Sequence, residues 1–342
     1  MAEKTLAVKY RPQSWDDVVE QDAIKYILQQ QLATHTHKNA YLFTGGAGTG
    51  KTTCARIFAR EINKGQGNPI ELDAASNNSV DDMRELIQQA KTKSLDSEHK
   101  VFIVDECHMI TNAGWNALLK LIEEPPAKSV FIFCTTDPQK IPKTILSRVQ
   151  RYDFRRISQN GIVQRLSSIL CAEHVPQYDD SLNAVKYIAK IADGGMRDAI
   201  TLMDKCLSYS EDLTVENVVK ALGTVDYEEM FFLTESIIEH DYKSLLACVE
   251  RIHSDGKDLK QFIKSYVGFI LDLCKYDHVR NCELLDMPNI YEDRLKKYNA
   301  HAYQDFAQML RAVVKLSTDI KWDNAPKMMI EASLLMLSGE LV

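Results

Sequence analysis

The stretch from Gly45 to Thr52, GGAGTGKT, constrains the fold of this chain more than any other feature. It matches the phosphate-binding loop pattern G-x-x-x-x-G-K-[ST] at every fixed position. The preceding residues Ala40–Thr44 read as a short buried strand, and Thr53–Glu61 carries apolar residues at helical spacing. A glycine-rich turn before a helix is the alternative interpretation. The lysine and threonine at the end of the motif favour a phosphate loop between a strand and a helix.

This loop is expected to hold the phosphates of a nucleotide. Glycines let the backbone turn so that successive N–H groups point at phosphate oxygens, and the following helix adds its positive N-terminal end. Lys51 is then expected to neutralise the β- and γ-phosphates, and Thr52 to hold Mg²⁺. The predicted nucleotide-binding residues of this stretch are Gly45, Gly46, Ala47, Gly48, Thr49, Gly50, Lys51, Thr52 and Thr53.

Length and composition indicate a globular protein of the cell interior. The 342 residues, of which 45% are hydrophobic and 26% charged, are enough for roughly two or three domains. The longest apolar runs, such as Val130–Cys134, are too short to cross a bilayer, and the N-terminus carries Glu3, Lys4 and Lys9 where a signal sequence has an apolar core. We therefore expect a cytoplasmic protein with no membrane partner.

Cysteine spacing and net charge bear on the kind of site. The eight cysteines are scattered without a C-x-x-C pair, which argues against zinc and against a redox dithiol. The net charge of −7 argues against a uniformly basic nucleic-acid-binding protein, although a local basic lining is compatible with it.

Strands alternate with helices in the first part of the chain. Over about 150 residues this alternation predicts a parallel α/β sheet covered by helices on both faces. The run from Lys100 to Glu106 is too apolar for an edge strand, so we expect it inside the sheet. Ser79 with Asp82 resembles a helix N-cap. Further strands are predicted at 69–73, 129–134 and 150–154, and helices at 22–33, 112–124 and 142–148.

From Ser158 onward the pattern is helical only. Gly194-Gly195 interrupts it before a helix predicted over Met196–Tyr209, and Leu222-Gly223-Thr224 is the expected joint before a second helical block. The predicted domains are therefore a nucleotide-binding domain over 1–157, a small helical lid over 158–223 and an all-helical domain over 224–342.

The strand that ends in Asp105-Glu106 is expected to supply the second half of the nucleotide site. Asp105 at the carboxyl end of such a strand can organise the water shell of Mg²⁺, while Glu106 orients and polarises the attacking water. Adjacent carboxylates at a strand end are also common as solvated residues. The phosphate loop upstream favours the catalytic interpretation.

Asp105-Glu106-Cys107-His108 also spells the D-E-x-H box of superfamily 2 helicases. Those helicases need a second parallel-sheet domain whose arginines close over the nucleotide, and the C-terminal half here has helical period without a comparable series of strands. His108 is therefore interpreted as an ordinary residue that follows the strand.

Three further residues are ambiguous on local grounds. Thr136 lies at the end of the next strand, where a hydroxyl can contact the γ-phosphate or the attacking water, or can cap the turn at Asp137-Pro138. Arg148 and Arg197 have nothing in their local sequence that separates them from solvated surface arginines.

Taken together, these residues resemble the AAA+ ATPases of sliding-clamp loaders. The resemblance is strongest to the gamma/tau family of bacterial DNA polymerase III and weaker to the small subunits of replication factor C. It covers nearly the whole chain and is specific in about the first two hundred residues. It is carried by Val8–Pro12, Gly45–Thr52, Glu71–Ser76, Asp105–Met109, Leu118–Lys120, Glu123–Pro126, Thr135–Pro142 and Ser147-Arg148.

The resemblance implies a role for each matching residue. Thr136 matches the first sensor of the γ-phosphate and Arg197 the second sensor, on the helical lid. Tyr10 and Arg11 match the segment that cradles the adenine. Arg148 matches the arginine finger, which in this family reaches into the neighbouring subunit's site. The implied cofactors are ATP and Mg²⁺, the latter held by Thr52 and Asp105, and an isolated monomer is expected to be a poor ATPase.

The chain departs from the family pattern at several positions. Ile62–Asn68 crosses the gap where the family carries a four-cysteine zinc module, so no zinc is expected. Ser147-Arg148-Val149 keeps the arginine of the family's S-R-C and loses the cysteine. Trp15 and Glu20 stand where phenylalanine and glycine are usual. We also expect no tau-specific extension, which favours a compact loader of bacterial or viral origin.

The implied partners are a sliding clamp, other clamp-loader subunits together with copies of this chain, in a pentamer, and primer-template DNA. DNA is expected to be held through phosphates. Candidate contacts are the helix N-termini near Asn77-Asn78-Ser79 and Thr111-Asn112, with Arg84, Lys91 and Lys93 nearby; ordinary capped helices are the alternative. The predicted function is an ATPase that loads the clamp. A nucleotide-stabilised scaffold and a translocating motor or helicase remain open.

Overall fold

The computed structural model describes residues 5–92, 94, 96–176, 180–222, 227–288, 291–298, 302–323 and 325–341. The chain forms two compact units, Met1–Pro176 with Ile188–Asp204, and Gln177–Tyr187 with Lys205–Val342. The division into three domains at 157/158 and 223/224 stays a prediction, and two residues of its second joint, Gly223 and Thr224, lie outside the described residues.

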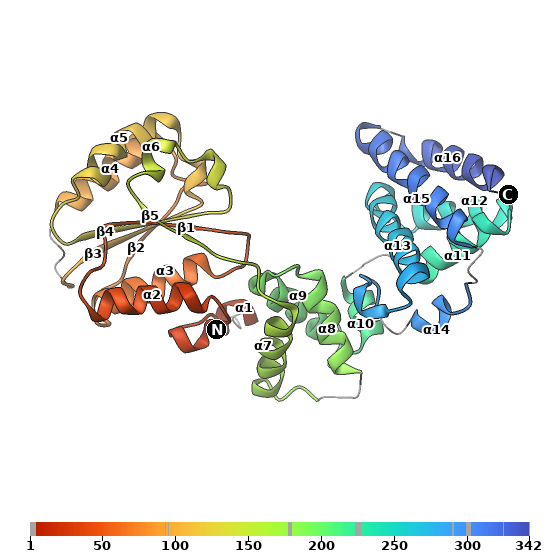
Figure 1. Cartoon of the computed structure of the whole chain (residues 1–342), viewed down its shortest axis with the longest axis horizontal. Helices are drawn as coiled ribbons and strands as arrows, with labels where there is room; N and C mark the ends of the chain where they lie inside the picture. Colours follow the sequence, from red (N-terminus) through yellow and green to blue (C-terminus); the bar gives the residue numbers. More distant parts are fainter. Residues whose placement is uncertain are drawn as a thin grey trace. The chain divides into compact units, whose positions relative to one another are not determined.

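A five-stranded parallel sheet forms the centre of the first unit (Figure 1). Its strands are β1 (Ala40–Thr44), β2 (Ile70–Asp73), β3 (Lys100–Asp105), β4 (Ser129–Thr135) and β5 (Gln150–Asp153). Their order is β2-β3-β4-β1-β5, which confirms the predicted α/β class and places β3 inside the sheet. β1 and β4 are buried at every residue because helices cover both faces.

Helices cover the sheet on both sides. In Figure 1, α2 (Asp22–Ala33) and α3 (Lys51–Ile62) lie on one face, and α4 (Val80–Lys91) and α5 (Asn112–Glu123) on the other. Successive residues of a strand point to opposite faces. Tyr41 and Phe43 therefore pack in the core that contains α3, whereas Leu42 packs with Trp115 of α5.

Shorter elements connect these layers. They are α1 (Leu6–Lys9), the 3₁₀ turns Trp15–Asp17, Cys107–Met109 and Pro138–Lys140, and α6 (Lys143–Leu146). Helix α3 begins at Lys51, earlier than the apolar pattern from Thr53 indicated, because Gly50 caps it with φ +99°. Ser79 and Asp82 form a capping box at α4, as predicted.

Beyond Asp153 the described residues contain helices and no strand. The helices are α7 (Gln159–Ala172), α8 (Ser181–Ile191), α9 (Met196–Tyr209), α10 (Val215–Leu222), α11 (Tyr227–Ile238), α12 (Tyr242–Ser254), α13 (Leu259–Val279), α14 (Glu292–Leu295), α15 (Ala302–Asp319) and α16 (Pro326–Glu340). In the second unit, α11–α13, α15 and α16 share one core that includes Phe231, Tyr266 and Leu334. Within the described part of the chain, no helix has the length and apolar character needed to cross a membrane.

Candidate nucleotide-binding site

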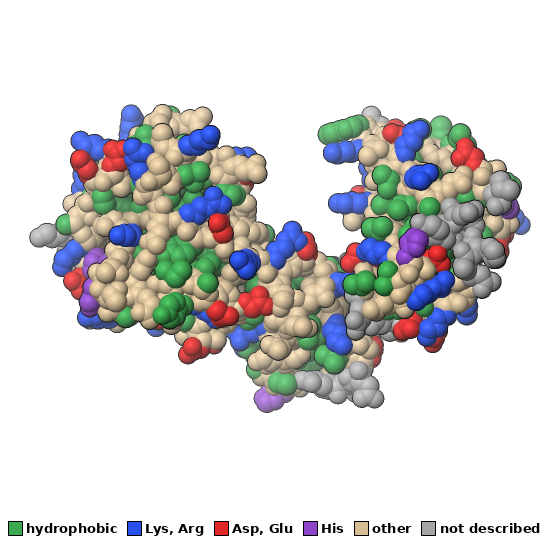
Figure 2. Space-filling view, viewed as in Figure 1, with side chains coloured by type: hydrophobic (Ala, Val, Ile, Leu, Met, Phe, Trp, Pro, Cys, Tyr) green, Lys and Arg blue, Asp and Glu red, His purple; other side chains and the backbone are tan. Residues whose placement is uncertain are grey.

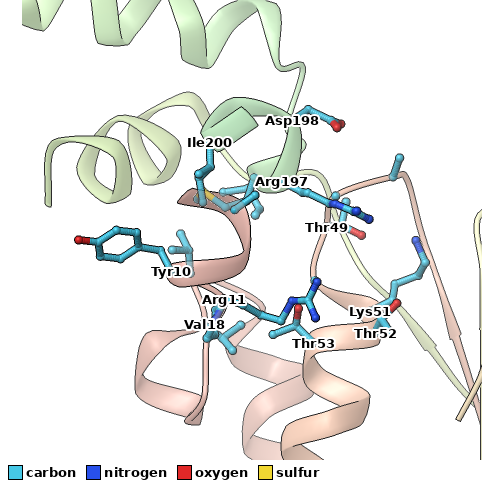
Figure 3. A pocket seen from close by; sticks show the side chains of 18 of the residues that line it. Tyr10, Arg11, Val18, Thr49, Lys51, Thr52, Thr53, Arg197, Asp198 and Ile200 are labelled. Atoms are coloured by element: carbon cyan, nitrogen blue, oxygen red, sulfur yellow. The ribbon is translucent and has the colours of Figure 1, made fainter. Parts of the chain in front are cut away.

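The phosphate loop and the lid meet around one cavity in the first unit (Figure 3). The acidic pair lines the same cavity. Its walls include residues 47–53 of the loop together with Asp105, Glu106, Arg11 and Arg197. The loop follows β1 and Asp105 ends β3, while β4 lies between these strands. Because the carboxyl ends of parallel strands meet at one edge of a sheet, the fold brings these distant segments together.

The glycines of the loop are required by its geometry. Gly45 has φ +148°, and a Cβ there would lie 2.5 Å from the carbonyl oxygen of Phe154. Gly48 has φ +67°, and a Cβ there would lie 2.9 Å from the Cα of Gly195. Gly48 O also accepts a 3.0 Å hydrogen bond from the N–H of Met196. The first residues of the lid helix α9 therefore rest directly on the phosphate loop.

Lys51 is buried at the start of α3. Its Nζ donates to the carbonyl oxygens of Gly45 and Gly46 at 2.9 and 2.8 Å. Burial lowers the pKa of Lys51 from its ordinary value, and the carboxylates of Glu106 and Asp105 oppose this effect. Carbonyl partners position the ammonium group without cancelling its charge, so the group suits a bound anion.

Thr52 and Asp105 form the pair that the sequence predicted for Mg²⁺. Thr52 Oγ1 donates to Asp105 Oδ2 at 2.9 Å. A hydroxyl and a carboxylate are hard oxygen ligands of the kind that Mg²⁺ prefers, and Mg²⁺ commonly takes only one or two protein ligands beside phosphates and water. These residues therefore fit the ion. In the described part of the chain, no group of three or more His, Cys, Asp or Glu residues is placed to hold a metal by itself.

Glu106 is held in a defined position beside this pair. Its backbone is left-handed, with φ +45°, and its N–H donates to Asp105 Oδ1 at 3.1 Å. Thr136 Oγ1 donates to Glu106 Oε2 at 3.1 Å. A non-glycine residue in this conformation is strained, and such strain gathers at functional sites. The structure thus joins the predicted acidic residue and the predicted sensor threonine.

His108 also contacts Glu106, which its interpretation as an ordinary residue after the strand did not anticipate. Its Nδ1 lies 3.2 Å from Glu106 Oε2 and 3.1 Å from Thr135 Oγ1. The short 3₁₀ turn Cys107–Met109 folds the imidazole back over the strand end. In the sequence, the D-E-x-H pattern at Asp105–His108 was the only feature that set His108 apart.

Two arginines from outside the loop add positive charge to the cavity walls. Arg197, at the start of α9, and Arg11 both line the cavity, and Figure 3 shows Arg11 reaching toward Thr53. Burial lowers the pKa of Arg11 from its ordinary value, and the nearby charges of Arg56 and Arg197 add to this effect. Cations that repel one another in one cavity are stabilised by a bound polyanion such as a nucleoside triphosphate.

The side chain of Tyr10 points away from Lys51 in Figure 3. Its hydroxyl donates to Glu173, just after α7, and Lys9 Nζ lies 2.6 Å from the same carboxylate. Arg165 donates to the carbonyl oxygen of Tyr10 at 3.1 Å. Tyr10 therefore borders the cavity while its phenol ties the N-terminal segment to the first lid helix.

Several cavity residues had no recognisable signal in the sequence. Apolar side chains of Val18, Val19, Ile157, Met196 and Ile200 form one part of the wall. They come from three separate segments of the chain, and their apolar character is typical of ordinary core residues. Arg56 and Arg165 also line the cavity and look like surface arginines on helices.

Arg148 is not among the residues that line this cavity. It follows the short helix α6, its side chain is 36% exposed, and it forms an ion pair with Glu123. Within this chain the structure therefore keeps the predicted arginine finger apart from the predicted nucleotide-binding residues.

The two helix N-termini that the sequence suggested as DNA contacts lie next to each other. The N–H of Thr111, which caps α5, donates to the carbonyl oxygen of Asn78, beside the cap of α4, at 3.2 Å. Arg84 pairs with Asp81 at 2.8 Å. Lys93 lies outside the described residues. Basic and acidic side chains are interspersed on the visible surface of each unit (Figure 2).

Comparison with solved structures supports the fold. RuvB from Thermotoga maritima, one structure of which is titled a Holliday junction branch migration motor, is similar over 73% of this chain and 86% of its own, with a TM-score of 0.53 and 19% identity. At this identity the likeness concerns the fold alone: an AAA+ parallel sheet with a helical lid.

Three protein families match successive parts of the chain. The family described as DNA polymerase III, delta subunit, matches residues 69–158. The DNA polymerase III clamp loader subunit, ATPase lid domain, matches residues 161–212. Domain III of DNA polymerase III subunits gamma and tau matches residues 213–339.

Characterised relatives match the chain along most of its length. DNA polymerase III subunit tau of Bacillus subtilis (strain 168) is 35% identical over 98% of this chain and 63% of its own length. The corresponding subunit of Escherichia coli (strain K12) is 32% identical over 79% of this chain and 45% of its own. The chain thus spans about half to two-thirds of the relatives it matches. It belongs to the gamma/tau family of DNA polymerase III clamp-loader subunits.

Proposed function

We propose that the chain is an ATPase subunit of a sliding-clamp loader. ATP binding drives assembly with the clamp and primer-template DNA, and hydrolysis releases the closed clamp on DNA. The observation that carries the proposal is that Thr52, Asp105 and Glu106 line one cavity in a gamma/tau family chain, with Thr52 bonded to Asp105 and Glu106 held by Thr136.

The residues predicted for the site each have a role in this reaction. The loop amides and Lys51 bind the phosphates. Thr52 and Asp105 would hold Mg²⁺, which would supply charge neutralisation at the transferring phosphate. Glu106 orients the attacking water. Thr136 already contacts Glu106, so a γ-phosphate that engages the Thr136 hydroxyl would free the carboxylate for this task. Arg197 contacts the γ-phosphate from the lid, and Tyr10 and Arg11 border the adenine.

Arg148 is proposed to act in the site of a neighbouring subunit. It lies on the surface, outside the cavity of its own chain, where an adjoining molecule can reach it. An arginine supplied in trans makes hydrolysis depend on assembly, with a contribution of roughly 10³ to 10⁵ in rate.

DNA is proposed to bind through its phosphates at the N-terminus of α5. The first turn of α5 contains no acidic residue, so its free N–H groups and helix dipole favour an anion. The α4 end is less suitable, because Asp81 and Asp82 already supply negative charge to its first turn. Of the two helix ends named from the sequence, the Thr111-Asn112 end is therefore preferred.

The remaining assignments follow from family membership. We propose the division into a nucleotide-binding domain, a helical lid and a helical oligomerisation domain, and assembly with other loader subunits or copies of the chain into a pentamer. Action in the cytoplasm of a bacterium, or of an infected bacterial host, follows from the same membership.

ATP turnover of the assembled complex tests the proposal. Adding primer-template DNA and clamp should raise turnover in wild type, and Glu106→Gln should abolish turnover while keeping ATP bound. A complex whose turnover does not respond to DNA and clamp would refute clamp loading. Unchanged behaviour of Glu106→Gln would instead indicate a scaffold, and strand displacement by the chain alone would indicate a helicase.

For the finger, Arg148→Ala should remove turnover in the complex while leaving ATP affinity nearly unchanged. Equal loss of ATP binding and turnover would contradict a role in trans. An arginine that acts in the neighbouring subunit's site contributes little to ATP binding by the chain that carries it.

A further inference from the structure

We propose that Glu123 is a counter-ion in cis that holds Arg148 against its own subunit and must release it before the finger can act. This inference rests on the proposed function of Arg148. Glu123 is the last residue of α5, and Arg148 follows α6, 25 residues later in the chain.

Nearly every donor of the Arg148 guanidinium has a partner in the free subunit. Nε and Nη2 each lie 2.6 Å from Glu123 Oε1. Nη1 donates to the carbonyl oxygen of Thr144 at 2.6 Å and to Ser147 Oγ at 3.1 Å. Of the five N–H groups that a guanidinium carries, these contacts engage four and leave one N–H of Nη2.

Glu123 occupies a position that disfavours a carboxylate. It lies at the C-terminal end of α5, where the helix dipole is negative, and the next residue, Glu124, is also acidic. Helix stability therefore does not explain the carboxylate at this position. The contact with Arg148 explains it, because the guanidinium neutralises the negative charge that the C-terminal end of the helix disfavours.

The ion pair also cancels the charge that an arginine finger needs. A guanidinium stabilises a phosphoryl transition state through its positive charge and its free N–H groups. With Glu123 at 2.6 Å, the charge is offset and the Nε–Nη2 edge is occupied. A γ-phosphate from a neighbouring subunit must therefore replace the carboxylate.

The geometry allows this exchange. The side chains of Arg148 and Glu123 are 36% and 46% exposed, so solvent and an incoming phosphate can reach the pair. The Nη1 contacts with Thr144 and Ser147 lie on the other side of the guanidinium and can persist during the exchange. Glu123 is thus a positioning residue that raises the threshold for hydrolysis until the subunit interface closes.

ATP turnover of the assembled complex, measured with and without primer-template DNA and clamp, tests the role of Glu123. Glu123→Gln keeps the size of the side chain and removes its charge. It should raise turnover without DNA and clamp by about two- to fivefold, the effect of removing one exposed ion pair. Turnover in the presence of primer-template DNA and clamp should change little. The ratio of stimulated to unstimulated turnover should therefore fall. Glu124→Gln, one residue further on, is the matched control and should leave both rates unchanged.

The Glu123→Gln/Arg148→Ala double variant separates this inference from the assignment of the finger. If Glu123 acts through Arg148, adding Glu123→Gln to Arg148→Ala should change nothing. The inference is overturned if Glu123→Gln raises turnover equally in wild type and in Arg148→Ala, or raises it in neither. It is also overturned if Glu123→Gln alone lowers turnover both with and without DNA and clamp. If Arg148→Ala itself keeps full stimulated turnover, the failure lies in the proposed function.

Discussion

Glu20 holds the N-cap residue of the first lid helix, Ser158, from 138 residues away in the sequence. Its two carboxylate oxygens each accept a 3.2 Å hydrogen bond from the N–H of Ser158, and Oε1 also accepts one from the hydroxyl of the same serine. Ser158 is the N-cap of α7. Glu20 itself has φ +56°, the left-handed region that favours glycine.

Substitution of Glu20 should separate these two effects. Glu20→Gly relieves the backbone strain and removes the hydrogen bonds to the capping residue Ser158, whereas Glu20→Ala removes the same bonds and keeps the strain. We expect Glu20→Ala to unfold more easily than Glu20→Gly by about 1 kcal/mol in urea titrations, since a side chain in the left-handed region costs about that much. In both variants the first amides of α7 should exchange hydrogen faster. Exchange at wild-type rates would contradict the capping role.

Trp15 makes a polar contact that phenylalanine cannot make. Its Nε1 donates to Glu61 Oε2 at 2.5 Å, and its ring is buried in the core that contains α3. Trp15→Phe should lower the free energy of unfolding by about 1–2 kcal/mol, through the lost hydrogen bond and the space left by the smaller ring. Glu61→Gln keeps an acceptor and is the control, with a smaller expected loss. Equal losses in the two variants would show that ring size contributes nothing.

The Thr52–Asp105 contact predicts how ATP binding responds to Mg²⁺. Chelating the metal should weaken ATP binding by wild type, by about tenfold or more. Thr52→Ala should bind ATP weakly with or without Mg²⁺, because it lacks the hydroxyl that accompanies Asp105. Thr53→Ala, one position along the same helix, should keep the response to the metal. Titration calorimetry measures all three, and a full Mg²⁺ response in Thr52→Ala would exclude this metal site.

Hydrogen bonds from Lys9 and Tyr10 lower the pKa of Glu173 from its ordinary value. A carboxylate with a depressed pKa in the folded state adds stability that is fully present above its unfolded pKa, about 4.3 for glutamate, and is lost as the pH falls through the folded value. The difference in free energy of unfolding between wild type and Glu173→Gln should therefore be constant near neutral pH and should shrink toward acid pH.

Urea unfolding at a series of pH values measures this difference. Glu211→Gln, an exposed glutamate of the second unit, should show no such trend. A difference that grows as the pH falls would mean that the contact does not require an ionised Glu173.

Local regularities made much of the fold predictable. The bounds of α2, β1 and α9 agree with the sequence prediction, because each has a clear period and a distinct start or stop. The bounds of α3 and α6 differ by one or two residues, since the first turn of a helix depends on caps and not on apolar spacing. The phosphate loop was predictable because it is a contiguous segment with glycines at fixed positions.

The sequence alone was sufficient for the parts of this protein whose physics is local: the phosphate loop, the alternation of strands and helices, the acidic strand end and the membership that these imply. Only the tertiary structure decided which distant groups meet. The contacts of Glu106 with Thr136 and His108, of Glu20 with Ser158, and of Arg148 with Glu123 join separate elements. The order of strands and the packing of helices set such distances, and no periodicity within one segment encodes them.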